Sequence, residues 1–312
     1  MKQENILITG GCGFVGLHVI DELIAKGYKR ISVLDNFFRA AKSFIKSKPV
    51  EVIECDIRSK GVLKTIFTGK KFSTVIHLAA IHYIPYCNQN PEETIAVNVN
   101  GTQNVLDAAA ETGVKRFFLA SSAAVYANLD RAFREEDPAE PLDIYGLTKL
   151  TNEYQARVAS IDSSCLFAIG RLFNAVGAYE TNPHLVPELV KRVKESSLIE
   201  IGNADPKRDY VHVKDIASGI VALTFQNSSR FDVLNIGSGK CYSVLDVVDG
   251  LSKLMNKKLE AVPNPKYMRK VDRALLLADI SKMKIKFHWT PKYSLLDALG
   301  DALEFGTVDR LQ

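Results

Sequence analysis

The chain has 312 residues, and its 40 lysines and arginines against 36 aspartates and glutamates give a formal net charge of +4. This near balance, without a basic block, gives no electrostatic case for nucleic acid or a membrane surface as a partner. No apolar run approaches the roughly 20 residues that a membrane helix needs. The five scattered cysteines include no CxxC pair, which argues against a disulfide framework and a metal site and indicates a cytoplasmic location.

Short apolar runs alternate with helical patterns through the first two thirds of the chain. The runs occupy residues 5–9, 30–35, 50–55, 74–80, 116–121 and 164–170. Apolar residues recur at i, i+3 and i+4 in the segments between them, at 18–27, 60–67, 102–113 and 147–160. Strands that alternate with helices predict parallel pairing and right-handed crossovers, and hence an α/β fold with a doubly wound parallel sheet.

The rhythm becomes irregular and rich in proline after about residue 172. We therefore expect a first domain over 1–172 and a smaller, loop-rich C-terminal region over 173–312. Some of the later chain is expected to cross back to the sheet.

Three glycines, Gly10, Gly13 and Gly16, lie between the first predicted strand and the first predicted helix. The amides and the dipole at a helix N-terminus can hold a pyrophosphate, and the missing Cβ atoms allow close approach. A tight turn without a ligand is the alternative. Asp35 ends the second strand, where a carboxylate can accept both ribose hydroxyls of an adenosine and repel a 2′-phosphate. The pattern favours NAD over NADP, although Arg39 leaves NADP open.

Tyr145 and Lys149 form a YxxxK pattern at the start of a predicted helix. An ammonium beside the phenol would lower the tyrosine pKa and make it usable as a base. A solvated helix face is the alternative. Ser121 and Ser122 end the fifth predicted strand at the same sheet edge as the glycine loop, and a hydroxyl there can bind the substrate oxygen that Tyr145 deprotonates.

Six motifs occur in order: TGGCGFVG, DN, HLAA, NVNGTQNVLDAA, SSAAVY and YGLTK. With them the chain resembles the extended short-chain dehydrogenase/reductase superfamily, and within it the NAD-dependent nucleotide-sugar epimerase/dehydratase family. The likeness continues through 170–179, 208–220, 234–239 and 278–291. It implies an NAD-binding Rossmann domain over 1–172, a nucleotide-sugar-binding region over 173–312, and a homodimer that packs through a helix over 147–160.

The resemblance also implies a role for individual residues. Tyr145 is the expected base and acid, Lys149 tunes it and holds the nicotinamide ribose, and Ser122 orients the sugar C4 oxygen. The residues expected to bind NAD, besides Tyr145 and Lys149, are Gly10, Gly13, Phe14, Val15, Gly16, Asp35, Asn36, Asp56, Ile57, Leu78, Ala79, Ala80, Asn98 and Phe173. Those expected to bind the nucleotide-sugar substrate, besides Ser122, are His82, Asn174, His184, Arg208, Arg269 and Asp272.

Ala123 and Ala124 depart from the family pattern. Dehydratases of the family carry an acidic pair there, which abstracts a proton from C5 and protonates the leaving C6 hydroxyl, and alanine does neither. The resemblance therefore predicts a nucleotide-sugar 4-epimerase that acts through a transient 4-keto sugar. The alternatives are a dehydratase or a 4-keto-sugar oxidoreductase, with His82, Tyr83 or Cys87 supplying the missing groups, and a non-catalytic NAD-sensing protein. His82 is otherwise a structural histidine of its loop, and His184 a helix cap.

Overall fold

The computed structural model describes residues 2–268 and 273–305, and they form two compact units. The first unit comprises residues 1–127, 137–172 and 217–234, and the second comprises 128–136, 173–216 and 235–312. The chain passes between the units at Leu172, where the sequence rhythm changes. Residues 217–234 return to the first unit. The short segment 128–136 belongs to the second unit, and the sequence pattern does not reveal this.

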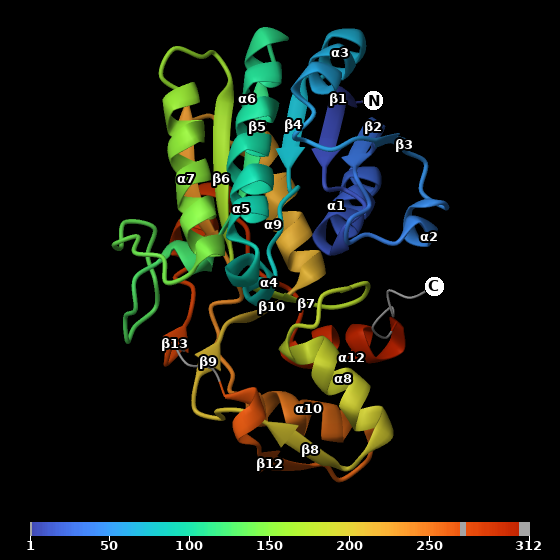
Figure 1. Cartoon of the computed structure of the whole chain (residues 1–312), viewed down its shortest axis with the longest axis vertical. Coiled ribbons are helices and arrows are strands. Elements are labelled where there is room, and N and C mark those ends of the chain that lie inside the picture. Colours follow the sequence, from blue (N-terminus) through green and yellow to red (C-terminus); the bar gives the residue numbers. More distant parts are fainter. Residues whose placement is uncertain (1, 269–272, 306–312) are drawn as a thin grey trace. The chain divides into compact units, whose positions relative to one another are not determined.

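The first unit is built on a seven-stranded sheet (Figure 1) with the order β11-β6-β5-β4-β1-β2-β3. Its strands are β1 (Lys2–Thr9), β2 (Tyr28–Asp35), β3 (Glu51–Glu54), β4 (Thr74–His77), β5 (Arg116–Ser122), β6 (Leu166–Leu172) and β11 (Phe231–Ile236). Neighbouring strands from β3 across to β6 pair in parallel. This arrangement confirms the predicted doubly wound sheet.

The strand order reverses beside β1. From β1 the chain continues to β2 and β3 on one side, whereas β4, β5 and β6 follow one another on the other side. In sheets of this kind ligands bind outside the carboxyl ends of the strands at the point of reversal. The ends of β1, β4 and β5 are therefore where a site is expected.

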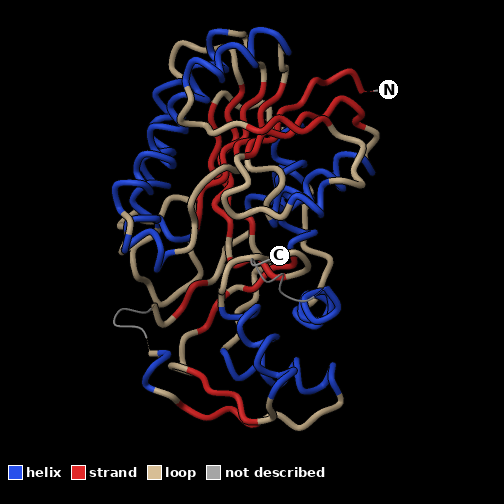
Figure 2. Tube along the Cα trace, turned by 45° about the vertical axis from the view of Figure 1, so that its right-hand side comes forward, coloured by secondary structure: helices blue, strands red, loops and turns tan. Residues whose placement is uncertain are grey.

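Helices flank this sheet (Figure 2). Helix α6 packs between α3 and α7, and α1 packs on β2. The helices of this unit are α1 (Phe14–Ala25), α2 (Lys42–Ile45), α3 (Lys60–Lys70), α4 (Ile84–Gln89), α5 (Pro91–Ile95), α6 (Thr102–Glu111), α7 (Ile144–Ala159) and most of α9 (Val213–Gln226), with a 3-10 turn η2 (Ala123–Val125).

The middle parts of the central strands are apolar, as in residues 6–8 of β1 and 117–120 of β5, which is typical of a doubly wound sheet with helices on both faces. Leu7, Val75, Phe117 and Phe167 come from four adjacent strands and are almost fully buried in one cluster with side chains of α3 and α6. This rigid cluster fixes the positions of the strand ends.

A π-helical turn, η1 (Ala96–Gly101), lies between α5 and α6 and joins them into one continuous helix. Such turns are rare and occur often at functional sites. Here the turn contains Asn98, which is fully buried.

The second unit contains three short parallel strand pairs and a group of helices. The pairs are β7 (Asn174–Val176) with β10 (Tyr210–His212), β8 (Leu198–Ile201) with β12 (Glu260–Pro263), and β9 (Lys207–Arg208) with β13 (Leu275–Leu276). The helices are α8 (Leu185–Glu195), α10 (Val244–Met255), α11 (Ser281–Phe287) and α12 (Leu295–Phe305), with a 3-10 turn η3 (Pro265–Tyr267). Leu189, Val247 and Leu299 bring α8, α10 and α12 together in a separate core.

Across residues 2–268 and 273–305, none of the helices combines the length and the apolar character that crossing a bilayer demands.

Candidate active site

The glycines between β1 and α1 serve two purposes. A Cβ on Gly10 would lie 2.7 Å from backbone atoms of Ala79, and one on Gly16 would lie 2.5 Å from the Cα of Gly11. These glycines permit close packing of the protein against itself. A Cβ on Gly13 would meet only the Gly10 carbonyl oxygen, at 3.2 Å. Gly13 is therefore the glycine of this loop whose missing side chain leaves room for a ligand.

The N-terminus of α1 suits a pyrophosphate. Gly13 precedes the helix and has no side chain to hydrogen-bond its first amides, and the first turn carries no acidic residue. The amides of Phe14, Val15 and Gly16 lack acceptors within the helix, because the first turn of any α-helix leaves such donors over. Donors of this kind, at the positive end of the helix dipole, match a phosphate group. The start of α1 thus fits the pyrophosphate of a dinucleotide.

Asp35 lies at the carboxyl end of β2 and faces the glycine loop. One of its carboxylate oxygens accepts from the Cys12 amide at 3.0 Å, and the other accepts from the Phe37 amide at 2.9 Å. Burial raises the pKa of this carboxyl, although these amide hydrogen bonds oppose the shift. Each oxygen keeps a lone pair, so the carboxylate can still accept the two hydroxyls of a ribose.

Asn36 and Asp56 are joined beside Asp35. The Asn36 amide donates to Asp56 at 2.9 Å, and Arg58 donates twice to the same carboxylate. The hydrogen bonds from Arg58 lower the pKa of Asp56 to about 2. Ile57 is buried, and a Cβ on Gly101 would lie 2.6 Å from its side chain. Of these three residues expected to bind NAD, Asn36 and Asp56 thus form a polar pair near the surface, whereas Ile57 mainly belongs to the core.

The loop after β4 is held close to the glycine loop. The Leu78 amide donates to the Thr9 carbonyl at 3.0 Å, and Ala79 packs on Gly10. Asn98 fixes the far end of this loop, because its side-chain oxygen accepts from the Ile81 amide at 2.8 Å and its nitrogen donates to the Ile81 carbonyl at 2.9 Å.

The Asn98 nitrogen also donates to the Thr148 hydroxyl, at 3.0 Å. With both amide protons engaged and no exposed surface, Asn98 holds the loop of Leu78, Ala79 and Ala80 in place. Its expected contact with NAD stays a prediction.

Ser122, Tyr145 and Lys149 meet at the carboxyl end of β5. Ser122 is the last residue of that strand, and its hydroxyl hydrogen-bonds the Tyr145 side chain. The Lys149 Nζ lies 5.9 Å from the centre of the Tyr145 ring and donates to the Ala120 carbonyl at 2.8 Å. A hydroxyl, a phenol and an ammonium thus converge at one strand end.

The start of α7 sets this convergence. Asp143 caps the helix by accepting from the Gly146 amide at 2.7 Å. A Cβ on Gly146 would lie 2.6 Å from the Ala124 carbonyl oxygen, so only glycine allows α7 to approach the turn after Ser122 this closely. Tyr145 is carried to Ser122 by that approach.

The pKa of Tyr145 shifts in the direction opposite to the sequence prediction. Burial raises the pKa of Tyr145, with the Ser122 hydrogen bond opposing the shift, whereas a net lowering by Lys149 was expected. Burial also lowers the pKa of Lys149 to about 8. Lys149 donates to a backbone carbonyl instead of the phenol. The desolvation of the phenolate therefore affects the pKa of Tyr145 more than the positive charge of Lys149 does.

A buried ion pair lies behind the three side chains. The Arg171 guanidinium makes two bonds to the Glu153 carboxylate, at 2.9 and 2.8 Å, and Glu153 also accepts from the Ser121 hydroxyl. The guanidinium lies 4.7 Å from the centre of the buried Tyr126 ring. Sequence reasoning missed this group. Its signal was a glutamate one helical turn after Lys149 and an arginine within an otherwise apolar strand.

Comparison with known proteins shows the family to which the chain belongs. A family model described as NAD dependent epimerase/dehydratase family matches residues 6–237. The chain belongs to this family. UDP-glucose 4-epimerase 4 of Oryza sativa subsp. japonica is 30% identical over 96% of this chain and 89% of its own length.

Solved structures of such epimerases share the fold. The UDP-glucose 4-epimerase of Stenotrophomonas maltophila, with bound NAD and formylated UDP-arabinopyranose, matches with a TM-score of 0.90 at 25% identity, over 97% of this chain and 98% of that one. The enzyme of Bifidobacterium longum, in complex with NAD+ and UDP, matches with a TM-score of 0.88 at 28% identity, over 96% and 97%. NAD is the cofactor of the family, and the open glycine loop and Asp35 suit it.

Ala123 and Ala124, the departure from the family's dehydratases, lie in η2 directly after Ser122. Ala123 is buried, and the Ala124 amide donates to the Ser122 hydroxyl at 3.1 Å. These two positions therefore orient Ser122 through the backbone and offer no proton donor or acceptor of their own.

The loop after β4 adds His82 and Cys87 near the catalytic group. Burial lowers the pKa of His82 to about 4, and the positive charge of Lys149 contributes. A neutral histidine can hydrogen-bond a sugar hydroxyl but is a poor proton donor at neutral pH. Burial raises the pKa of Cys87 to about 11, and its thiol faces the Ile81 carbonyl at 3.6 Å. Cys87 is thus a buried packing residue.

The second unit carries the other expected site residues. Phe173 is buried, Asn174 begins β7, and His184 precedes α8 without making a side-chain cap. Arg208 donates to the backbone carbonyls of Lys207 and Arg273, at 2.9 and 2.7 Å. Arg269 and Asp272 lie outside the described residues.

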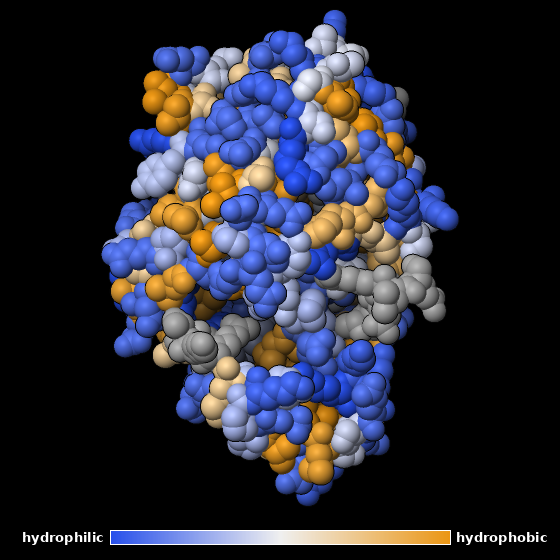
Figure 3. Space-filling view, viewed as in Figure 1, coloured by the Kyte–Doolittle hydropathy of each residue, from blue (hydrophilic) through white to orange (hydrophobic). Residues whose placement is uncertain are grey.

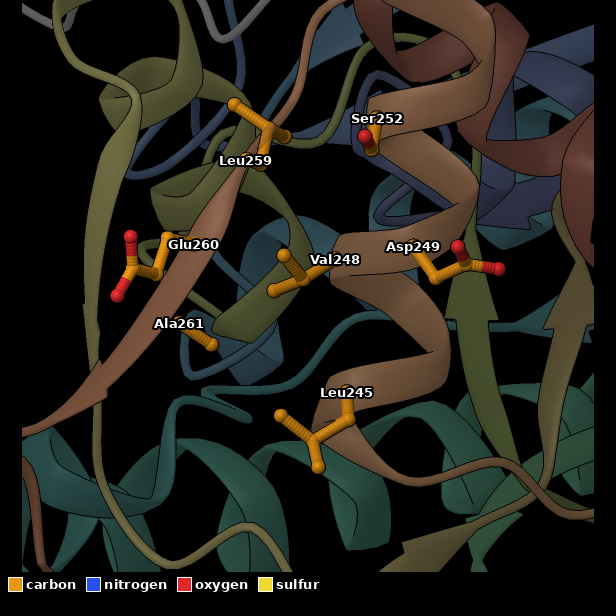
Figure 4. A pocket seen from close by; sticks show the side chains of 7 residues that line it. All are labelled: Leu245, Val248, Asp249, Ser252, Leu259, Glu260 and Ala261. Carbon is orange, nitrogen blue, oxygen red and sulfur yellow. The ribbon is translucent and has the colours of Figure 1, made fainter.

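A cavity of about 340 Å³ lies between α10 and β12 of the second unit (Figure 4). Aliphatic side chains of Leu245, Val248 and Leu259 face the space between the helix and the strand, whereas Asp249 points away from it. Asp249, Ser252 and Glu260 complete its lining with Ala261, and none of the residues expected to bind NAD or substrate lines it.

Proposed function

We propose that the chain is an NAD-dependent nucleotide-sugar 4-epimerase whose substrates are UDP-sugars. The observation that carries this proposal is the convergence of Ser122, Tyr145 and Lys149, followed directly by Ala123 and Ala124. The first three supply the groups for reversible oxidation of a sugar alcohol, and the alanines remove those that a dehydratase needs. The similar epimerases, one solved with UDP and one with a UDP-sugar, support UDP as the nucleotide.

Tyr145 would take the proton from the C4 hydroxyl of the sugar, while Ser122 donates a hydrogen bond to the same oxygen. Bound NAD would supply the acceptor for the hydride from C4 and the donor that returns it to the opposite face of that carbon. Tyr145 then gives its proton back to the oxygen, so no proton or electron pair is gained or lost overall. Because the pKa of Lys149 is near 8, its ammonium remains charged at neutral pH and favours the phenolate.

The test is to incubate the purified protein with UDP-, GDP-, CDP- and dTDP-sugars in D₂O and to identify the products by NMR and mass spectrometry. We expect a UDP-sugar to give a product of unchanged mass, with inverted C4 configuration and no deuterium at C5. Deuterium at C5 or the loss of water would indicate a dehydratase, and net formation of NADH an oxidoreductase. Any of these results would overturn the proposal.

Asp35 is the proposed determinant of NAD binding. Its carboxylate would accept the two hydroxyls of the adenosine ribose and repel a 2′-phosphate. Asp35→Ala should therefore weaken NAD binding and reduce the difference between the affinities for NAD and NADP, both measured by calorimetry. A wild-type protein that binds NADP more tightly than NAD would contradict this role.

Residues of the second unit have proposed substrate roles. Arg208, Arg269 and Asp272 would hold the diphosphate and ribose, since a guanidinium fork pairs with phosphate oxygens. Asn174 and His184 would add hydrogen bonds, and Phe173 would lie near the nicotinamide. Arg208→Ala should raise the KM for the nucleotide sugar while NAD binding stays unchanged, and a KM equal to that of the wild type would contradict the assignment.

A homodimer through α7 is proposed as well. Leu147, Tyr154 and Val158 are exposed on one face of α7, and Ile161 follows in the same register. Figure 3 shows apolar side chains in orange over the part of the surface where α7 lies. Light scattering should give a dimer for the wild type and a monomer for Val158→Glu.

We also propose a cytoplasmic location, which suits the free cysteines in the described chain. Cell fractionation would test it.

A further inference from the structure

Three polar side chains lie along the side of α7 that packs on the π-helical turn η1. They belong to Thr148, Asn152 and Gln155, which follow one another at steps of four and three residues and therefore share one face of the helix. Apolar contacts between helices have no preferred direction, whereas a hydrogen bond requires a narrow range of distance and angle. Polar contacts along this face can therefore fix how α7 is rotated and shifted against η1.

Two of these side chains bind the backbone of the turn. The Asn152 Nδ2 donates to the Asn98 carbonyl at 2.7 Å, and the Gln155 Nε2 donates to the Val99 carbonyl at 3.1 Å. The Asn152 Nδ2 also donates to the Gln155 side-chain oxygen at 2.9 Å, which joins the two amides to each other. The two amides thus hold η1 at two successive residues.

Thr148 binds the side chain of Asn98. The Asn98 nitrogen donates to the Thr148 hydroxyl at 3.0 Å, and that hydroxyl donates in turn to the Tyr145 carbonyl at 2.8 Å. The same Asn98 side chain makes two bonds to the backbone of Ile81. A continuous path of hydrogen bonds therefore runs from the backbone of Tyr145 to the loop after β4 that is expected to bind NAD.

Asn152 keeps its orientation although one of its atoms is unsatisfied. Its side-chain oxygen is buried and has no hydrogen-bond partner within the part of the chain that the structure describes. The opposite orientation of the amide would place this oxygen against the Asn98 carbonyl, which can only accept. A buried acceptor without a partner costs free energy, so the bonds of Asn152 add little to stability overall. What they determine is the position of the turn.

We propose that Thr148, Asn152 and Gln155 are positioning residues for the epimerase reaction. They fix the register of α7 against η1, and thereby place Tyr145 and Lys149 of the same helix relative to NAD held by the loop after β4. The base and the cofactor act on one carbon and its oxygen, and a displacement of about 1 Å can lower a rate by about 100-fold. This inference rests on the proposed function and adds three residues that act through α7 and η1.

The experiment compares Thr148→Val with Thr148→Ser. Valine has the shape of threonine but offers no acceptor to Asn98, whereas serine keeps the hydroxyl and loses a buried methyl group. We expect Thr148→Val to weaken NAD binding and to lower kcat by about three- to tenfold each, which is the size of one hydrogen bond, with the KM for the UDP-sugar within about twofold of the wild type. Thr148→Ser should restore most of the NAD affinity and kcat, although the lost methyl group lowers its melting temperature. Calorimetry, steady-state kinetics and circular dichroism measure these quantities.

Two further variants complete the test. Asn152→Leu removes the donor to η1 together with the unpaired oxygen, and the Asn98 carbonyl keeps the Thr102 hydroxyl as a donor at 2.5 Å. It should therefore lower NAD affinity and kcat without lowering the melting temperature, and it keeps the test decisive if the valine variant does not fold. Thr224→Val is the matched control, because this threonine is equally buried and its hydroxyl donates to the Ile220 carbonyl of its own helix, α9, at 2.7 Å. It should bind NAD and turn over as the wild type does.

The inference is overturned if Thr148→Val and Asn152→Leu match Thr224→Val in NAD affinity and kcat, if Thr148→Ser loses as much as Thr148→Val, or if the KM for the sugar is the only quantity that changes. A wild-type protein that neither binds NAD nor interconverts UDP-sugars would overturn the proposed function itself. An active wild type with no difference among the variants would overturn this inference alone.

Discussion

The two units hold their polar side chains in different ways. In the first unit the backbone of the sheet determines where the polar side chains lie, because its parallel strands end at one edge and carry Ser122 and Asp35 to it. In the second unit buried carboxylates tie the loops together. Asp209 accepts from the amides of Ser238, Gly239 and Ala278, and Asp215 accepts from two further amides. The first unit also has a buried carboxylate of this kind, Asp35, but its sheet already fixes the strand ends, whereas the loops of the second unit depend on such carboxylates.

The largest effect we expect tests the chemistry of the first unit. Tyr145→Phe keeps the ring but removes the proton carrier, so kcat should fall by about 10²–10⁴-fold while the fold and NAD binding persist. Tyr154→Phe, on the exposed part of the same helix, is the matched control and should be fully active. Steady-state kinetics and circular dichroism would measure both, and near-normal turnover of Tyr145→Phe would refute the mechanism.

The next effect tests the anchors of the second unit. Asp209→Ala leaves the buried amide of Ala278 without its acceptor, at roughly 1–3 kcal/mol, and removes the acceptor of the more accessible amides of Ser238 and Gly239, so we expect a loss of about 2–3 kcal/mol in the free energy of unfolding. Asp297→Ala removes a carboxylate that binds Ser294 on the exposed start of α12, and it should cost about 1 kcal/mol. Equal losses in urea unfolding would show that burial does not distinguish the two.

Glu180 makes the stability of the folded protein depend on pH. Burial raises the pKa of this carboxyl to about 7, so the folded state binds its proton more tightly than the unfolded state. The stabilisation is present below pH 4.5 and is lost as the pH rises through 7, an effect of about 3 kcal/mol. Glu180→Gln stays neutral, so in urea unfolding it should match the wild type near pH 5 and exceed it by about that amount at pH 8. A constant difference between the two proteins would contradict this.

The smallest effect that we expect tests which glycine of the loop serves packing and which serves the binding of NAD. Gly16→Ala would force a methyl group onto the backbone of Gly11, so it should lower the free energy of unfolding by about 1–3 kcal/mol. Gly13 has φ −76° and ψ 173°, which alanine adopts readily, so Gly13→Ala should keep its stability and lose NAD affinity. Gly61→Ala, in open space within α3, is the control. Equal thermal stability of all three variants would refute the division of roles.

The sequence predicted the first unit well because its strands are continuous apolar runs and its helices are periodic. It also placed Gly13, Asp35, Ser122 and Tyr145, since each follows a strand or opens a helix. It did not reveal the pair of Glu153 and Arg171. Two charges that neutralise each other inside a protein resemble surface residues in a sequence pattern.

The second unit was harder to predict, because long-range hydrogen bonds define it. Asp209 binds residues about thirty and seventy positions away, and no local pattern signals such a partner. The segment 128–136 belongs to this unit through Phe133, whose amide donates to the Leu277 carbonyl at 2.8 Å. The effect of burial on the pKa of Tyr145 likewise needed the three-dimensional surroundings.

The π-helical turn of η1 limits how the chain can change in length. A π-turn closes its hydrogen bond over five residues, whereas an α-helical turn closes it over four, so deleting one residue would restore a regular helix. Everything on one side of the deletion would then rotate by about 100°. Asn98 could no longer face Ile81 while α6 kept its apolar side toward the core. Most surface loops accept gain or loss of a residue easily, but this helix tolerates neither without losing the loop that follows β4.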